Sequence, residues 1–453
     1  MNIESASREQ LIAVIKTQQQ EINELKKRIA QLERKLPPDL PFHPKPGIKL
    51  KDKKKREKRN HGYARTLDTP THVVKHAYTA CPDCGSHVYE GWLQRRRQII
   101  DIPLASATVT EHQVYEHWCS QCKKKIAPRL DLSDQVLGNH RISIKTMSYI
   151  ATLRERERKP IYEIQAHLQH FYGLSLSAGE ITEICHTVAD HSIPLYETLS
   201  DQVRASPVVH ADETGWREGG VNGYIWNFNT PVVRYLTYQK TRGSIVVQKV
   251  VGDAFEGVLV SDFYSSYNTH LGFHQRCWVH LLRDIKKLTE THPDNQGLIL
   301  WACSVQELYQ QAKDYVQPDP IQHSDIRSQQ KKRWQDANRF KDQLLTLCTP
   351  YLKKSVPQQT LCQRIDTYQD ELFLFIADPR VPADNNSAER SLRHSVISRK
   401  ISGGTRSEKG SITKFILASL FGTWRLQNKN PFQECLNLLT AVSTGKPLPA
   451  IVP

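Results

Sequence analysis

Hydrophobic residues in the first part of the chain recur every seven positions. The two series are Ile15, Ile22, Ile29 and Leu36, and Leu11, Leu25 and Leu32, with Gln18 interrupting the second. Isoleucine at heptad position a with leucine at d favours a parallel two-stranded coiled coil. Residues 1–37 are therefore predicted to be a coiled-coil dimerisation helix. Because fewer than four clean heptads are present, a single amphipathic helix on a domain surface is the alternative.

The middle of the chain consists of short apolar runs bounded by turn residues, which is typical of β-strands. The first three runs are PVVHADETGW, GYIWNFNT and VVRYLTYQ, and two further strands then alternate with helices as far as LLRDIKKL. Three antiparallel strands followed by alternating helices and parallel strands leave few simple topologies besides a ribonuclease-H-like sheet. We expect a multidomain α/β protein, with residues 206–293 as the first part of a ribonuclease-H-like core and residues 379–425 as its second part.

Helical periodicity marks three further stretches. In residues 131–205, two predicted helices flank Gly173, and Ser177 with Glu180 has capping-box spacing at the start of the second. We interpret 131–205 as a helical DNA-binding region with a helix-turn-helix, and a plain αα-hairpin in the core is the alternative. The other two stretches are residues 294–378, which prolines interrupt, and the C-terminal helical segment 426–453.

Composition limits the class of protein. The chain has 453 residues, of which 39% are hydrophobic, so it has enough apolar side chains for several cores and is not disordered throughout. No apolar run reaches the roughly 18 residues of a membrane span, and the first residues lack a signal-peptide pattern. We therefore expect a cytoplasmic protein without a membrane partner. The net charge of +15 favours a polyanionic partner, with nucleic acid as the first candidate.

A basic segment follows the predicted coiled coil. Prolines from Pro37 onward end the helix, and nine Lys or Arg residues between Lys45 and Arg59 face only two acids. Residues 38–70 are predicted to be a flexible basic linker whose cations contact DNA phosphates, with a solvated linker as the alternative. The candidate DNA-binding residues here are Lys53, Lys54, Lys55, Arg56, Lys58 and Arg59.

Two CxxC pairs lie within residues 71–130. The four thiols are Cys81 and Cys84 in the first pair and Cys119 and Cys122 in the second. Four thiolates are the number that a tetrahedral structural Zn²⁺ site requires, and such a site has no open position for substrate. We predict a structural zinc-finger module, in which His76, His87 or His117 is an alternative ligand. The six remaining cysteines are predicted to be packing residues; they are Cys185, Cys277, Cys303, Cys348, Cys362 and Cys435.

Two aspartates close apolar runs of the predicted sheet. Asp212 and Asp262 each follow such a run, and side chains at the carboxyl ends of neighbouring parallel strands converge on one crevice. Glu389, early in a later helix, supplies a third acid. Carboxylate oxygens favour Mg²⁺ or Mn²⁺, and two such ions can cleave or transfer a phosphodiester. The alternative for a single aspartate after a strand is a turn residue or helix cap.

Basic residues surround the third acid. Arg390 and Arg393 flank Glu389, and the segment SRKISGGTRSEKG contributes Arg399 and Lys400. These four residues are predicted to hold a DNA backbone near the metal ions, while a surface turn is the alternative for the second segment.

Three blocks of the sequence resemble those of a known family. HADETGW, SDFYSSY followed by CWVHLLRD, and DNNSAERSLR are similar to the catalytic blocks of the insertion-sequence 66 family of bacterial DDE transposases. The resemblance implies a leucine zipper, a two-knuckle zinc finger and a retroviral-integrase-like core with a helical insertion at 294–378. It also implies Asp212, Asp262 and Glu389 as the metal-binding catalytic triad. Cys277 and His280 occupy the family's C-x-x-H positions.

The resulting hypothesis is a homodimeric, nucleoid-associated cut-and-paste transposase. Metal-activated water would cleave at the terminal inverted repeats of the element, and the freed 3′-hydroxyl would then attack target DNA, with or without accessory transposition proteins. The alternatives are a ribonuclease-H-like nuclease without joining activity and a zinc-dependent DNA-binding regulator with an inactive core.

Overall fold

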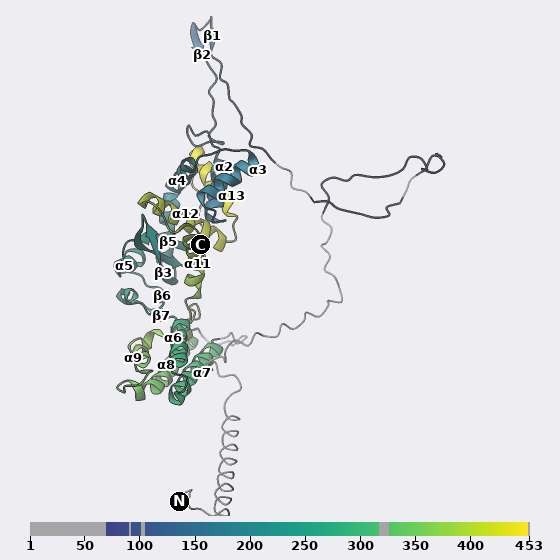
Figure 1. The fold of residues 1–453 in the computed structure, drawn as a ribbon. Helices are drawn as coiled ribbons and strands as arrows, with labels where there is room; N and C mark the ends of the chain where they lie inside the picture. The colour runs from purple at the N-terminus through teal and green to yellow at the C-terminus, as the bar shows by residue number, and fades with distance from the viewer. Residues whose placement is uncertain (1–68, 90–91, 101–104, 317–325, 452–453) are drawn as a thin grey trace, which may run out of the picture. The chain divides into compact units, whose positions relative to one another are not determined.

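The computed structural model describes residues 69–89, 92–100, 105–316 and 326–451 (Figure 1). The predicted coiled coil of 1–37 and the basic residues 53–59 lie outside the described residues. The chain divides into two compact units, which we describe separately. Within the described residues, one unit comprises 114–165 and 177–451 without 317–325, and the other comprises 69–113 without 90–91 and 101–104, together with 166–176.

A five-stranded mixed sheet lies at the centre of the larger unit. Its strands are β3 (Val208–Glu218), β4 (Val221–Asn229), β5 (Arg234–Gln239), β6 (Val258–Ser261) and β7 (His274–Arg276). Their spatial order is β5-β4-β3-β6-β7. β3, β4 and β5 pair antiparallel, whereas β6 is parallel to both β3 and β7. The protein is therefore a mixed α/β protein.

The connections follow from local sequence. Gly219 and Gly220, both with positive φ, make the tight turn between β3 and β4, as expected for a two-residue hairpin loop. Helix α5 (Ile245–Val251) connects β5 to β6, whose four residues are all buried. Between β6 and β7 the structure has only the 3₁₀ helix η2 (Ser265–Thr269).

Strand β3 is longer than the sequence predicted. We expected Asp212 to close its strand, but β3 continues to Glu218 and pairs with β4 along this length. The parallel pairing with β6 ends earlier, at His210 opposite Val260. Asp212 therefore lies inside a strand, just beyond the parallel part of the sheet.

Helices of the second half of the chain cover the antiparallel part of the sheet. α11 (Asn386–Ser402) contacts β3 and β4, and α12 (Glu408–Leu426) contacts β5. Their shared core consists of Trp216, Ile225, Leu236, Leu392, Phe415 and Ala418. α2 (Ile144–Glu155), α4 (Ala178–Arg204) and α13 (Pro431–Thr444) pack against α12 and one another.

A second core joins the parallel strands to a group of helices. α6 (Trp278–Thr291), α7 (Gln296–Tyr315), α8 (Ile326–Cys348), α9 (Gln359–Thr367) and α10 (Leu374–Ala377) gather beyond β7 (Figure 1). This core runs from Val208 and Val260 of the sheet through Trp278 to Phe340 and Phe373. Two 3₁₀ helices, η3 (Thr349–Tyr351) and η4 (Gln369–Glu371), complete the group.

The remaining elements precede the sheet. β1 (His117–Cys119) and β2 (Lys124–Ile126) form a two-stranded antiparallel ribbon. α3 (Ile161–Tyr172) ends before Gly173, which has positive φ, and the Ser177 hydroxyl accepts a hydrogen bond from the Glu180 amide at the start of α4. Among the described residues, no helix combines the length and apolarity that a bilayer crossing requires.

Candidate active site

Two aspartates lie just beyond the parallel pairing of neighbouring strands. β3 and β6 are in register at His210 and Val260, and Asp212 and Asp262 each come two residues later. The parallel register therefore directs the two residues to the same edge of the sheet.

The carboxyl group of Asp212 lies among other acids. Its Oδ1 accepts a hydrogen bond from the Glu213 amide at 2.9 Å. Burial, together with the charges of Glu213, Asp262 and Glu389, raises the pKa of Asp212 to about 8. All three predicted catalytic acids therefore interact electrostatically in one region, and this acidic cluster would be relieved by a bound cation.

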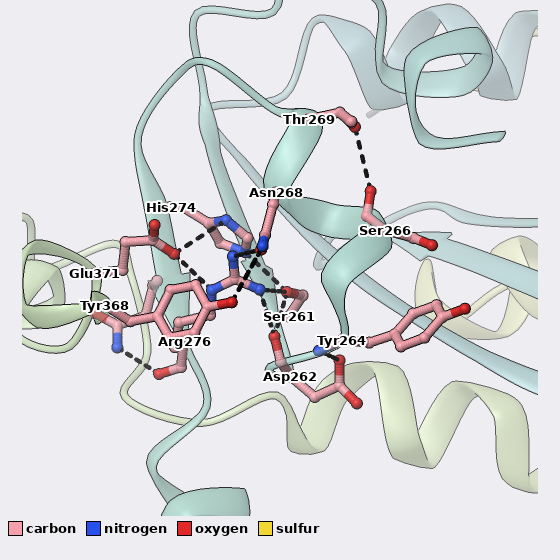
Figure 2. A network of polar contacts seen from close by, with 11 residues as sticks. Ser261, Asp262, Tyr264, Ser266, Asn268, Thr269, His274, Arg276, Tyr368 and Glu371 are labelled. Atoms are coloured by element: carbon pink, nitrogen blue, oxygen red, sulfur yellow. Dashed lines mark hydrogen bonds and ion pairs between the residues drawn. The ribbon is translucent and has the colours of Figure 1, made fainter. Parts of the chain in front are cut away.

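Asp262 is held by its own loop and by a buried arginine. Its Oδ1 accepts a hydrogen bond from the Tyr264 amide at 2.9 Å. Its carbonyl oxygen accepts two more, from Ser261 Oγ and from Arg276 Nη1, each at 2.8 Å. Figure 2 shows the carboxyl group of Asp262 beside Tyr264 and pointing away from Arg276. Both the backbone and the side chain of Asp262 are thus fixed.

Glu389 lies in the first turn of α11 and faces two basic side chains of α6. Its Oε1 is 3.6 Å from His280 Nε2 and 3.7 Å from Arg283 Nη2. His280, which sequence analysis noted without a role, therefore lies beside the third acid. The imidazole Nδ1 of His280 is buried and has no hydrogen-bond partner in the described residues.

Asn385 attaches the start of α11 to the strand that carries Asp212. Its Nδ2 donates to the Ala211 carbonyl at 2.7 Å, and its Oδ1 lies 2.9 Å from His210 Nδ1. Burial lowers the pKa of His210, so at neutral pH the ring is uncharged and donates from Nδ1. The main-chain N–H of Asn385 donates a hydrogen bond to Cys277 Sγ at 3.2 Å. Cys277 therefore has a specific contact that its sequence context did not indicate.

A second polar cluster, which the sequence did not indicate, lies beside Asp212. The buried carboxylate of Glu213 accepts a hydrogen bond from Arg242 Nε at 2.9 Å and another from the Tyr267 hydroxyl. The Arg242 guanidinium also lies 3.7 Å from the ring centroid of Tyr264. The only signal in the sequence was that Glu213 adjoins Asp212, because its partners are distant along the chain.

The basic residues predicted on α11 differ in their surroundings. Arg390, Arg393 and Lys400 are exposed. Arg399 is half-buried and donates to Thr214 Oγ1 at 3.1 Å and to the Gly215 carbonyl. Arg399 thus fastens the end of α11 to β3, whereas the three exposed cations are accessible.

The donor set of the acidic cluster fits a hard divalent cation. Carboxylate oxygens from Asp212, Asp262 and Glu389 are the ligand type that Mg²⁺ and Mn²⁺ prefer, and burial together with the neighbouring acids raises the pKa of Asp212. Across the described ranges, no group of three or more His, Cys, Asp or Glu side chains forms a ready-made metal cage. The acids are therefore neighbours that have not converged on a ligand geometry.

The two CxxC pairs adopt the same local conformation. In each, the residue after the second cysteine has positive φ, at Gly85 and at Lys123. The Cys122 amide donates to Cys119 Sγ at 3.4 Å and lowers the pKa of that thiol, and hydrogen bonding with Ser86 does the same for Cys84. One thiol of each pair, Cys84 and Cys119, is thus shifted toward the thiolate form, which is the form that binds zinc. The two knuckles belong to different units.

The other six cysteines are all buried free thiols, as the sequence led us to expect. Burial raises the pKa of Cys185 and Cys435 to about 12 and that of Cys277 to about 11, so these thiols stay protonated at neutral pH.

Comparison with known proteins identifies the class of this molecule. A family model described as the IS66 family of transposases matches residues 140–412, which is more than half of the chain. A second model, the zinc-finger binding domain of transposase IS66, matches residues 79–123. The chain belongs to the IS66 family of transposases, which confirms the resemblance seen in its three sequence blocks.

Three uncharacterized proteins of Sinorhizobium fredii (strain NBRC 101917 / NGR234) are similar to parts of the chain. Protein y4jD is 24% identical over 63% of this chain and 60% of its own length. Protein y4qI is 22% identical over 67% of this chain and 60% of its own length. Protein y4jO is 28% identical over 43% of this chain and 56% of its own length. The chain thus spans somewhat over half the length of these relatives.

Proposed function

We propose that the protein is a DNA transposase that cleaves DNA strands at transposon ends and joins the freed ends to target DNA. The observation that carries this proposal is geometric: Asp212 and Asp262 each follow the last parallel pair of β3 and β6 by two residues, and Asn385 ties the start of the helix that bears Glu389 to the Ala211 carbonyl. Those acids come from a strand, a strand end and a helix that are distant in the sequence. Membership of the IS66 transposase family supports the same conclusion.

We further propose that the sheet is a ribonuclease-H-like core. Three antiparallel strands, followed by two parallel strands on the other side of β3, support this assignment. Helix α11 brings Glu389 to the side of β3 that also holds Asp212, because Asn385 bonds to the Ala211 carbonyl. The helices α7 to α10 would be the insertion between Asp262 and Glu389.

Asp212, Asp262 and Glu389 would hold Mg²⁺ or Mn²⁺. Such ions, when bound, supply Lewis-acid activation of water or a 3′-hydroxyl and stabilise the leaving oxygen. Asp212 gives up its proton to become a ligand, and the amide of Tyr264 keeps one oxygen of Asp262 oriented. Arg390, Arg393 and Lys400, exposed on α11, would contact the DNA backbone next to the acids.

The remaining parts would bind and pair the transposon ends. We propose that residues 1–37 dimerise the protein, that the basic linker 38–70 contacts phosphates, and that the region 131–205 contacts the terminal repeats. The zinc-finger family match supports a DNA-binding role for residues 71–130.

A strand-transfer assay tests the proposed activity. With Mg²⁺, the purified full chain should join a pre-cleaved DNA end carrying the cognate terminal repeat to a target plasmid. Omission of divalent cation should abolish joining. Hydrolysis without joined products would instead identify a nuclease, and binding without either product would identify a DNA-binding regulator.

We predict one structural zinc ion per chain. Metal analysis of the purified protein should find about one equivalent of zinc, and Cys119→Ser should lower the zinc content and weaken binding to terminal-repeat DNA, because a thiolate ligand is lost. Cys303→Ser is the matched control, since that cysteine is a buried thiol of α7. Full zinc retention in Cys119→Ser would contradict the assignment of that ligand.

A further inference from the structure

Arg276, the last residue of β7, is fully buried and contacts three separate segments (Figure 2). Its Nε donates to Glu371 Oε2 at 2.5 Å, and its Nη2 donates to Asn268 Oδ1 at 2.6 Å. Its Nη1 donates to the Asp262 carbonyl at 2.8 Å. The planar guanidinium thus donates from all three of its nitrogens to three separate acceptors, which a lysine ammonium does not reproduce.

The charge of Arg276 is balanced from the helical side of the molecule. Glu371 ends η4, and the ring of Tyr368, one residue before η4, lies 4.6 Å from the Arg276 guanidinium. Burial and the neighbouring Arg276 hold the pKa of His274 well below its ordinary value, so this ring is neutral and adds no second cation. A buried arginine needs such a paired acid, because its desolvation is otherwise uncompensated.

The same helical segment is attached to β7 by a second residue. Gln275 Nε2 donates to the Leu372 carbonyl at 3.1 Å, and Gln275 Oε1 accepts from the Phe375 amide at 3.0 Å. Residues 368–375 therefore form a continuous attachment to the strand that carries Arg276.

On its other side, Arg276 fixes the peptide group of Asp262. Ser261 Oγ and Arg276 Nη1 both donate to the Asp262 carbonyl, and Ser261 Oγ also lies 2.8 Å from His274 Nε2. Because the Tyr264 amide holds Oδ1 of the same residue, the backbone orientation of Asp262 sets the direction of its carboxylate.

We propose that Arg276 is a positioning residue through which the end of the helical segment, Tyr368 and Glu371, sets Asp262 for metal binding. This inference rests on the proposed function, because it takes Asp262 to be a metal ligand. It gives the helices between Asp262 and Glu389 a role inside the active site. Changes at residues 368–371 alter metal affinity without touching a metal ligand.

Metal binding by the DNA-free full-length protein tests this inference directly. Free Mn²⁺ is measured by electron paramagnetic resonance during titration of wild type, Arg276→Lys, Tyr368→Leu and Asp262→Asn. Residues that orient metal ligands are worth about 10- to 100-fold in metal affinity, so Arg276→Lys should weaken Mn²⁺ binding by about 10-fold. Tyr368→Leu, which removes the ring beside Arg276, should weaken Mn²⁺ binding less than Arg276→Lys does. Asp262→Asn should weaken Mn²⁺ binding most.

Strand cleavage at increasing Mn²⁺ provides the second measurement. Arg276→Lys should raise the half-saturating Mn²⁺ concentration by the same factor, and excess Mn²⁺ should restore most of the maximal rate. The matched control is Arg204→Lys. Arg204 donates to the Val250 and Lys249 carbonyls and to Asp201, so this variant tests loss of an arginine that bridges α4 and α5 and has no hydrogen bond to Asp262 among its contacts.

The outcomes separate the two claims. If Asp262→Asn binds Mn²⁺ as tightly as the wild-type protein does, the proposed function is overturned. If Asp262→Asn binds Mn²⁺ more weakly but Arg276→Lys keeps the wild-type Mn²⁺ affinity, only the positioning role of Arg276 is overturned. If Arg276→Lys does not fold, Tyr368→Leu decides, because an unchanged Mn²⁺ affinity in that folded variant contradicts the coupling.

Discussion

Asp212→Asn is expected to reduce strand cleavage and joining on the order of a thousandfold or more, because a metal ligand contributes several kcal/mol to charge stabilisation in the transition state. Asparagine keeps the oxygen that accepts from the Glu213 amide, so the strand geometry is preserved. The measurement is the single-turnover rate on pre-cleaved and intact ends with Mg²⁺. A variant that cleaves at the wild-type rate would remove Asp212 from the proposed site.

The same variant should be more stable than wild type without metal. Burial and neighbouring acids raise the pKa of Asp212 to about 8, so in the folded protein ionisation of this carboxyl is unfavourable. In the unfolded chain this carboxyl has its ordinary pKa of 3.8, and the folded state therefore loses stability from Asp212 as pH rises between these two values. Thermal unfolding in EDTA should show a Tm advantage for Asp212→Asn that grows from about pH 4 to about pH 8 and then levels off.

Glu408→Gln provides the control for that pH dependence, since Glu408 is an exposed acid in the first turn of α12. The difference in Tm between Glu408→Gln and wild type should not grow with pH in this way. If Asp212→Asn and Glu408→Gln behave alike, the raised pKa of Asp212 is wrong.

Lys414→Met is expected to lower the free energy of unfolding by about 3–5 kcal/mol, because it leaves a buried carboxylate without its partner. Lys414 of α12 and Glu155 of α2 form an ion pair of 2.7 Å, and their side chains are 4% and 1% exposed. Burial lowers the pKa of Lys414, while Glu155 opposes this shift. Urea unfolding followed by circular dichroism measures the loss.

The double variant Glu155→Leu with Lys414→Met is the matched comparison. Replacement of both charges by apolar side chains of similar size is commonly close to neutral, so most of the lost stability should return. A single Lys414→Met variant within about 1 kcal/mol of wild type would mean that Glu155 finds another partner or takes up a proton.

Short stretches of sequence were enough to predict the strands and the helix start that depend on local residue patterns. The short apolar runs anticipated the strand that holds Asp212 and the strand that Asp262 follows, and capping-box spacing anticipated the start of α4 after Ser177. The three family blocks led to the correct family. The length of β3 was not predicted, because Asp212 resembles a strand-ending residue in sequence, whereas pairing with β4 carries the strand on to Glu218.

Contacts between distant segments could not be predicted. The partners of Glu213 are Arg242 and Tyr267, and Arg276 meets Glu371 across 95 positions of the chain. Such pairs depend on the packing of helices against the sheet, and nothing in local periodicity or composition specifies them. The contacts of Arg399 with Thr214 and Gly215 were likewise not indicated by the sequence, and its contact with DNA stays a prediction.

The position of Asp212 inside a continuous antiparallel ladder has a mechanical consequence. Its backbone is locked opposite Asn227, whereas Asp262 follows the end of a short strand and Glu389 rides on the first turn of a helix. Any adjustment of Asp212 toward a bound cation is therefore limited to rotation of its side chain, because the ladder keeps its main chain in place.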